Sequence, residues 1–85
     1  MSKKYKLIFT REFLRRLRRL NKSTQVRVIR EIKTLEINPF AGKRLRGRLS
    51  GLLSFRVRNY RIIYQVSEEQ IVIRTIGHRK TIYER

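Results

Sequence analysis

The chain of 85 residues contains no cysteine, one histidine, one proline and only six acidic residues. The lack of cysteine excludes a disulfide framework and a thiolate zinc site, and a single histidine cannot build a histidine-rich metal site. We therefore expect no metal and no cofactor. The apolar runs are only a few residues long. They are too short for a membrane-spanning helix or a signal peptide, so we expect a soluble, cytoplasmic protein without a membrane partner.

Positive charge is the dominant feature of what the sequence does contain. Lys and Arg total 23, which gives a formal net charge of +17 at pH 7. Such an excess repels itself unless a polyanion or an acidic partner neutralises it, and nucleic acid is the first candidate. The hydrophobic share of 40% is ordinary for a folded protein. A chain this short is therefore expected to form a single domain over residues 1–85.

The first half of the chain predicts a strand followed by a helical hairpin. Apolar residues alternate over residues 5–10 as in a strand, and Thr10 is suited to cap a helix. The apolar residues of that helix recur at helical spacing at Phe13, Leu14, Leu17 and Leu20. Residues 21–23 interrupt the pattern, and a second helix is expected to end at Asn38-Pro39. Its expected buried stripe consists of Val26, Ile29, Ile32 and either Leu35 or Glu36.

The second half predicts a basic loop and three strands. Residues 40–51, FAGKRLRGRLSG, hold three glycines and four cations and indicate an ordered basic loop or an irregular edge segment. They do not form a Walker loop, because Ile37 occupies the position where that loop needs its first glycine. Apolar and polar residues then alternate over residues 52–58, 60–66 and 70–76. The predicted fold class is α+β, a two-layer β-α-α-β-β-β arrangement whose antiparallel sheet carries the helical hairpin on one face.

Pairing of the first two of these strands brings two arginines together. With Arg58-Asn59 as a two-residue turn, Arg56 lies directly opposite Arg61. Like charges that face each other on a sheet are destabilising by about 0.2–1 kcal/mol. The pair therefore indicates a bound anion, because guanidinium groups match phosphate oxygens. The alternative is that the two long side chains diverge into solvent.

The last predicted strand completes this face of the sheet. A four-residue turn at residues 67–70 places Arg74 and Ile76 on the arginine side, with Ile76 beside Arg61. The chain then leaves the strand near the same end of the sheet with His78, Arg79 and Tyr83. The sequence thus predicts a convergent phosphate site that includes an imidazole able to titrate near neutral pH. The alternatives are a histidine in an exposed turn and a tyrosine packed on the edge of the core.

Two blocks of sequence carry a resemblance to a known family. They are LRGRLSGLLSFRVRNYRIIYQV at residues 45–66 and GHRKTIY at residues 77–83. Along almost its whole length the chain resembles the RelE/ParE superfamily of toxin-antitoxin modules, whose fold is this β-α-α-β-β-β arrangement. The second block is similar to the RelE-like branch, whose members cut messenger RNA in the ribosomal A site. ParE-like members instead poison DNA gyrase.

The resemblance implies an enzyme, a ribosome-dependent endoribonuclease that blocks translation. In such toxins the 2′-hydroxyl attacks the adjacent phosphate without a metal, so the substrate must be RNA. Arg56, Arg61 and Arg79 match the family's phosphate contacts, and Tyr83 matches an aromatic residue that orients a base. Ser54 replaces a lysine that transfers a proton in some relatives. Because arginine is a poor proton shuttle, we hypothesise that His78 is the general acid or base.

The implied partners are messenger RNA, the ribosome and a RelB-like cognate antitoxin. The cations expected to contact RNA or the ribosome are Lys43, Arg44, Arg46, Arg48, Arg58, Arg74, Arg15 and Arg19. Further arginines extend a cationic face over the helices, namely Arg11, Arg16, Arg18, Arg27 and Arg30. Two alternative functions remain open. One is a gyrase inhibitor without chemistry of its own, favoured by the missing lysine, and the other is a basic nucleic-acid-binding relative that lacks activity.

Overall fold

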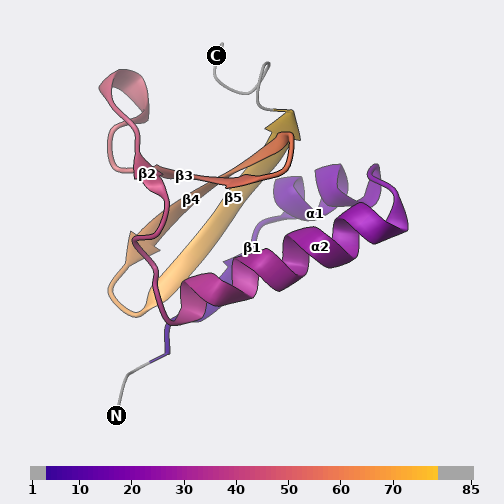
Figure 1. Ribbon diagram of the computed structural model, residues 1–85. Helices are drawn as coiled ribbons and strands as arrows, with labels where there is room; N and C mark the ends of the chain where they lie inside the picture. Colours follow the sequence, from indigo (N-terminus) through magenta and orange to yellow (C-terminus); the bar gives the residue numbers. More distant parts are fainter. Residues whose placement is uncertain (1–3, 79–85) are drawn as a thin grey trace.

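The computed structural model describes residues 4–78. Five strands form one sheet in the order β1-β5-β4-β3-β2, and both helices lie on one side of it (Figure 1). In chain order the elements are β1 (Lys6–Phe9), α1 (Arg11–Arg18), α2 (Lys22–Lys33), β2 (Lys43–Arg44), β3 (Leu53–Val57), β4 (Tyr60–Ser67) and β5 (Gln70–His78), with 3-10 turns at Thr34–Glu36 and Gly47–Leu49. The predicted α+β class with a helical hairpin on one face is confirmed. No helix in this part of the chain is long and apolar enough to cross a membrane.

The edges of the sheet differ from the sequence prediction. β1 pairs with β5 in parallel, whereas the other neighbouring strands are antiparallel. Strands joined by a tight hairpin must be antiparallel, but β1 meets β5 only after most of the chain has intervened, so no turn dictates its direction. At the opposite edge the basic segment contributes the two-residue strand β2. This agrees with the expected irregular edge segment.

Both helices begin at side-chain caps. The Thr10 hydroxyl accepts a hydrogen bond from the Phe13 amide at 3.2 Å, as the sequence predicted. Asn21 caps α2 in the same way, because its Oδ1 accepts from the Thr24 amide at 2.8 Å. The Thr10 hydroxyl also lies 2.9 Å from the Ile73 carbonyl and 2.8 Å from the Arg74 carbonyl of β5. One residue therefore starts α1 and fixes that helix to the middle of the sheet.

The buried stripe of α2 differs from the predicted one. Val28, Ile32 and Leu35 are fully buried, while Val26 is 55% exposed. A helix turns by about 100° per residue, so Val26 points about 160° away from Val28 and about 120° away from Ile32. Residues at a constant spacing of three therefore do not stay on one face of the helix, and Val26 points away from the core. Ile29 is half-buried and packs against the core from the side.

The strand registers are confirmed as far as the middle of β5. Arg56 lies opposite Arg61 and Val57 opposite Tyr60, while Val66 pairs with Ile71. The prediction for Ile76 is wrong. It pairs with Ile62 and is 2% exposed in the core, on the face opposite the arginines.

A β-bulge causes this difference. Tyr64 pairs with Ile73, but its neighbour Ile63 pairs with Thr75, so Arg74 is an extra residue in β5. An extra residue reverses the alternation of side chains beyond it. Arg61 consequently pairs with Gly77, which presents no apolar side chain next to the guanidinium group.

Tyr64 connects the core to the basic loop. Its ring is fully buried, its hydroxyl donates to the Pro39 carbonyl at 2.8 Å, and its oxygen accepts from the Gly42 amide at 3.0 Å. Burial raises the pKa of the Tyr64 phenol above its usual value of 10.0, and the Gly42 hydrogen bond opposes that rise. The residues before β2 are thereby held through two main-chain groups.

Replacing Tyr64 by phenylalanine should lower the free energy of unfolding by about 1–3 kcal/mol, because Pro39 and Gly42 lose their partner. Urea unfolding measures this difference. Since the pKa is raised in the folded state, the wild-type advantage is full below about pH 10 and shrinks as the pH rises through the folded-state pKa. Tyr5→Phe is the control, because it removes a phenol hydroxyl and leaves the hydrogen bonds of Tyr64 to Pro39 and Gly42 in place. An advantage that stays constant well above pH 10 would contradict this account.

Candidate nucleic-acid interface

The opposed arginines of the β3–β4 hairpin do not converge. Arg56 Nε donates to the Arg58 carbonyl at 3.5 Å, toward the turn. Arg61 donates from Nη1 to the Ser54 hydroxyl at 3.5 Å, away from the turn. The two guanidinium groups thus diverge along the hairpin, which relieves their repulsion. Arg56 is exposed, whereas Arg61 is half-buried.

Arg61 instead joins the basic loop. An open hollow of about 400 Å³ is lined by Lys43, Arg44, Leu45, Arg46 and Arg61. We call it the basic cleft. Among residues 4–78 no carboxylate lines it, so its four cations face a space that favours an anion. Three cations predicted to bind RNA therefore gather around one of the two strand arginines predicted to bind the phosphate.

Main-chain pairing holds the loop residues in this position. Lys43 pairs with Ser54 across β2 and β3, and the Leu45 amide donates to the Leu52 carbonyl at 3.0 Å. The Arg44 guanidinium lies 5.9 Å from the centroid of the Phe40 ring, within cation–π range. Because cross-strand partners share a face, Lys43 lies on the same side of the sheet as Ser54 and Arg61. This juxtaposition could not be predicted from the sequence, because it depends on how the loop folds back on β3.

His78 lies at the same end of the sheet as Arg61 but on the other face. It pairs with Tyr60, and the two rings meet edge to face with centroids 6.1 Å apart. Tyr60 alternates with Arg61, so the bulge at Arg74 has moved His78 to the helix side of β5. The structure therefore does not bring the imidazole into the basic cleft. Arg79 and Tyr83, also predicted for the site, lie outside the described residues.

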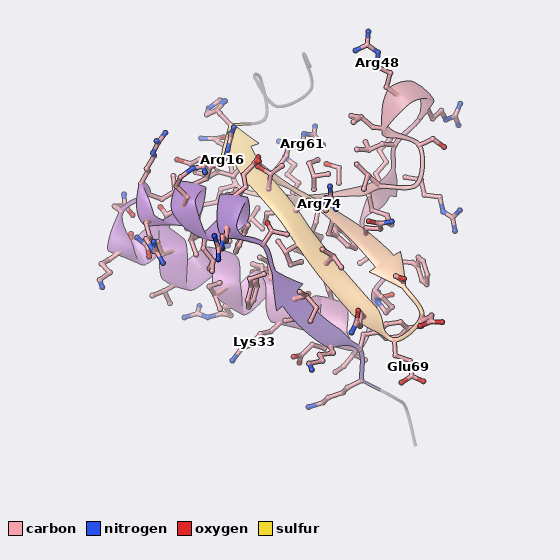
Figure 2. The ribbon with its side chains drawn as sticks, turned by 180° about the vertical axis from the view of Figure 1, so that it is seen from behind. Arg16, Lys33, Arg48, Arg61, Glu69 and Arg74 are labelled. Atoms are coloured by element: carbon pink, nitrogen blue, oxygen red, sulfur yellow. The ribbon has the colours of Figure 1, made fainter. Side chains whose placement is uncertain are left out.

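The remaining predicted RNA-binding residues are exposed and dispersed. Arg74 lies at the bulge of β5, and Arg58 lies in the β3–β4 turn. Arg48 extends from the 3-10 turn away from the sheet (Figure 2). Arg15 and Arg19 are exposed at α1 and its end. These five cations therefore lie on separate elements, and none of them lines the basic cleft.

Comparison with known proteins identifies the family. Residues 7–83 match the family model of the ParE toxin of the type II toxin-antitoxin system parDE. The chain belongs to the RelE/ParE toxin superfamily. It is therefore a toxin of a type II toxin-antitoxin system, as its sequence blocks indicated. No curated protein sequence matches the toxin.

Solved structures with the same fold include both branches of the superfamily. The toxin-antitoxin complex RelBE2 from Mycobacterium tuberculosis is similar with a TM-score of 0.83 and 30% identity, covering 89% of this toxin and 99% of that chain. The intact E. coli RelBE toxin-antitoxin complex gives a TM-score of 0.74 and 25% identity, covering 87% and 95%. The ParDE system from P. aeruginosa gives a TM-score of 0.74 and 14% identity, covering 87% and 95%. The last likeness shows the fold alone.

Proposed function

We propose that this toxin is an endoribonuclease that cuts messenger RNA on the ribosome in the cytoplasm. The observation that carries the proposal is the basic cleft, in which Arg61 meets three loop cations and no described residue contributes a carboxylate. Such a cleft complements the phosphodiester. It complements even better the charge that develops on the phosphate oxygens during in-line attack. The likeness to RelE-type structures at 25–30% identity supports the same reading.

In the proposed reaction the 2′-hydroxyl oxygen forms a bond to the adjacent phosphorus, and the bond to the 5′-oxygen breaks. The products are a 2′,3′-cyclic phosphate and a 5′-hydroxyl, so the leaving oxygen must gain the proton that the nucleophile loses. Arg61 would stabilise the phosphate charge. We assign the donation of a proton to the leaving oxygen to the Lys43 ammonium, because Lys43 lines the same cleft and pairs with Ser54. His78, on the other face, is a weaker candidate than the sequence indicated.

The proposal is tested by incubating purified toxin with a programmed messenger RNA on ribosomes and with the same RNA free in solution. Cuts on the ribosome that end in a cyclic phosphate are expected. A message carrying a 2′-deoxynucleotide at the cut position is the matched control, since it lacks the nucleophile. An absence of cuts by folded toxin would overturn the proposal.

A second candidate function is inhibition of DNA gyrase. It is favoured by the match to the ParE family model and by Ser54 in place of the lysine that some RNA-cleaving relatives use. In this case the basic cleft would dock an acidic or DNA-bound surface and perform no chemistry. Arrest of gyrase supercoiling by the toxin, without RNA cleavage, would establish it.

The proposed regulator is a RelB-like antitoxin. The M. tuberculosis, E. coli and Pyrococcus horikoshii relatives were each solved as complexes of RelE-type and RelB-type proteins. With a net charge of +17, this toxin is best complemented by an acidic partner. Such an antitoxin would exclude substrate by covering the basic cleft.

A further inference from the structure

A second cationic hollow lies apart from the basic cleft. It measures about 490 Å³ and is lined by Ser23, Thr24, Val26, Arg27, Arg30 and Arg58. Three guanidinium groups and two hydroxyls line it, no carboxylate does so within the described part of the chain, and none of these residues lines the cleft. It is formed where the first half of α2 meets the turn between β3 and β4. We infer that this hollow, here called the turn site, binds a phosphate of an RNA backbone.

The electrostatics of α2 favour a negative charge in the turn site. The first turn of this 12-residue helix contains Ser23 and Thr24 but no acidic residue, so nothing in it offsets the positive end of the helix dipole. Arg27 is only loosely held, because its Nε lies 3.8 Å from Glu31 Oε2, beyond hydrogen-bond distance. Both side chains of that pair are about two-fifths exposed, at 43% and 38%. The Nε atom itself is buried, but the Arg27 side chain as a whole reaches the solvent and lines the hollow without a short ion pair to hold it.

The strand side of the turn site is independent of the helix. Arg58 is exposed in the β3–β4 turn and has a φ of +54°. Residues other than glycine are strained in this left-handed region. Arg58 therefore occupies a turn position that glycine would fill with less strain. The turn loses local stability, and the hollow gains a positive charge. Guanidinium groups from two separate elements thus converge on one space.

The chemistry of the site selects a phosphate group. Guanidinium forks donate to phosphate oxygens, and a hollow of about 490 Å³ has room for a phosphodiester. Arg58 lies in the turn that precedes β4, and Arg61 is the second residue of that strand. A single RNA strand held in the basic cleft can therefore continue over the turn to this second contact. The inference concerns binding and does not depend on the cleavage proposed above.

The test replaces Arg58 by glycine, which removes the cation and relieves the backbone. Binding of a labelled single-stranded RNA with 2′-O-methyl groups, which cannot be cleaved through the 2′-oxygen, is measured by fluorescence anisotropy over a range of salt concentrations. Loss of one phosphate contact should weaken binding at low salt and reduce the slope of log K against log salt by about 0.7. The urea midpoint of the variant should equal or exceed that of the wild type, so lost binding cannot be ascribed to unfolding.

Two variants serve as controls. Glu68→Gly relieves the same strain in the β4–β5 turn, where φ is +53°, and should not reduce the slope. Lys6→Ala removes one positive charge beside Gln70, at the far end of the sheet, and should change the slope much less than Arg58→Gly. Equal effects of Lys6→Ala and Arg58→Gly would overturn the inference in favour of diffuse attraction.

Two further results would also contradict the turn site. One is an Arg58→Gly variant that binds inorganic phosphate more weakly than the wild type but RNA equally well, since the hollow would then serve a free anion. The other is an unchanged RNA slope together with weaker binding of an acidic antitoxin. That result would assign the hollow to a protein partner.

Discussion

Replacing Arg61 by alanine is expected to slow RNA cleavage on the ribosome by about 10²–10³-fold, as is typical when one preorganised donor is removed from a charged transition state. Arg61 is half-buried and brings a β4 guanidinium group to the basic cleft, whose other described lining residues come from the loop and β2. Its hydrogen bond to the Ser54 hydroxyl is long, at 3.5 Å, and its replacement removes one of two like charges that face each other on the sheet. The free energy of unfolding should therefore change by less than about 1 kcal/mol.

Arg56→Ala is the matched control for this prediction. It removes the same charge from the directly opposite position, but Arg56 is exposed and turned toward Arg58. We expect a much smaller loss of cleavage. Single-turnover rates on programmed ribosomes, and growth arrest on expression, give two readouts of the difference. Equal losses in both variants would mean that the pair acts together, as the sequence alone indicated, and that the cleft is not the site.

Replacing Gly42 by alanine is expected to lower the free energy of unfolding by about 2–4 kcal/mol, combining overpacking with a lost hydrogen bond. A methyl group there would lie 2.6 Å from the Tyr64 hydroxyl and 2.8 Å from the Ser54 carbonyl. The Ser54 carbonyl belongs to the backbone of β3, so it cannot move aside without disturbing the sheet. Lys43, the next residue, would be displaced from the cleft, and cleavage should fall together with stability.

Gly47→Ala distinguishes this close packing from the ordinary cost of replacing a glycine. Gly47 has a φ of +68° but open space around its Cα, so its replacement should cost only about 1 kcal/mol. Urea unfolding and cleavage rates are measured for both variants. If Gly42→Ala were as mild as Gly47→Ala, the contact between Tyr64 and the loop would not hold the cleft together.

The sequence predicted those parts of the fold that short-range chemistry determines. The two-residue turn at Arg58-Asn59 fixed the pairing of Arg56 with Arg61, and the cap at Thr10 fixed the start of α1. The local sequence does not indicate the bulge at Arg74, because the polar pair Arg74-Thr75 is as compatible with an exposed strand as with a bulge. Its stabilising contact comes from the Thr10 hydroxyl, 64 residues away in sequence. The error at Ile76 and the change of face at His78 both follow from it.

The candidate site was predictable in composition but not in arrangement. Cationic residues in the loop and on β4 were evident from the sequence, and the resemblance assigned Arg61 to phosphate binding. Which arginine of the facing pair enters the cleft depends on the path of the loop. That path depends on the Tyr64 hydroxyl reaching Pro39 and Gly42. Contacts between residues more than 20 positions apart cannot be read from periodicity or turn chemistry.

The attachment of the loop separates the residues that fold this toxin from those that select its target. Tyr64 holds the loop through a carbonyl and an amide of the main chain. These two hydrogen bonds do not involve the side chains of Lys43, Arg44 and Arg46. Substitutions at these positions can change the shape and charge of the cleft while the path of the chain stays the same. The scaffold is thus suited to acquiring new specificities by point mutation, without passing through unstable intermediates.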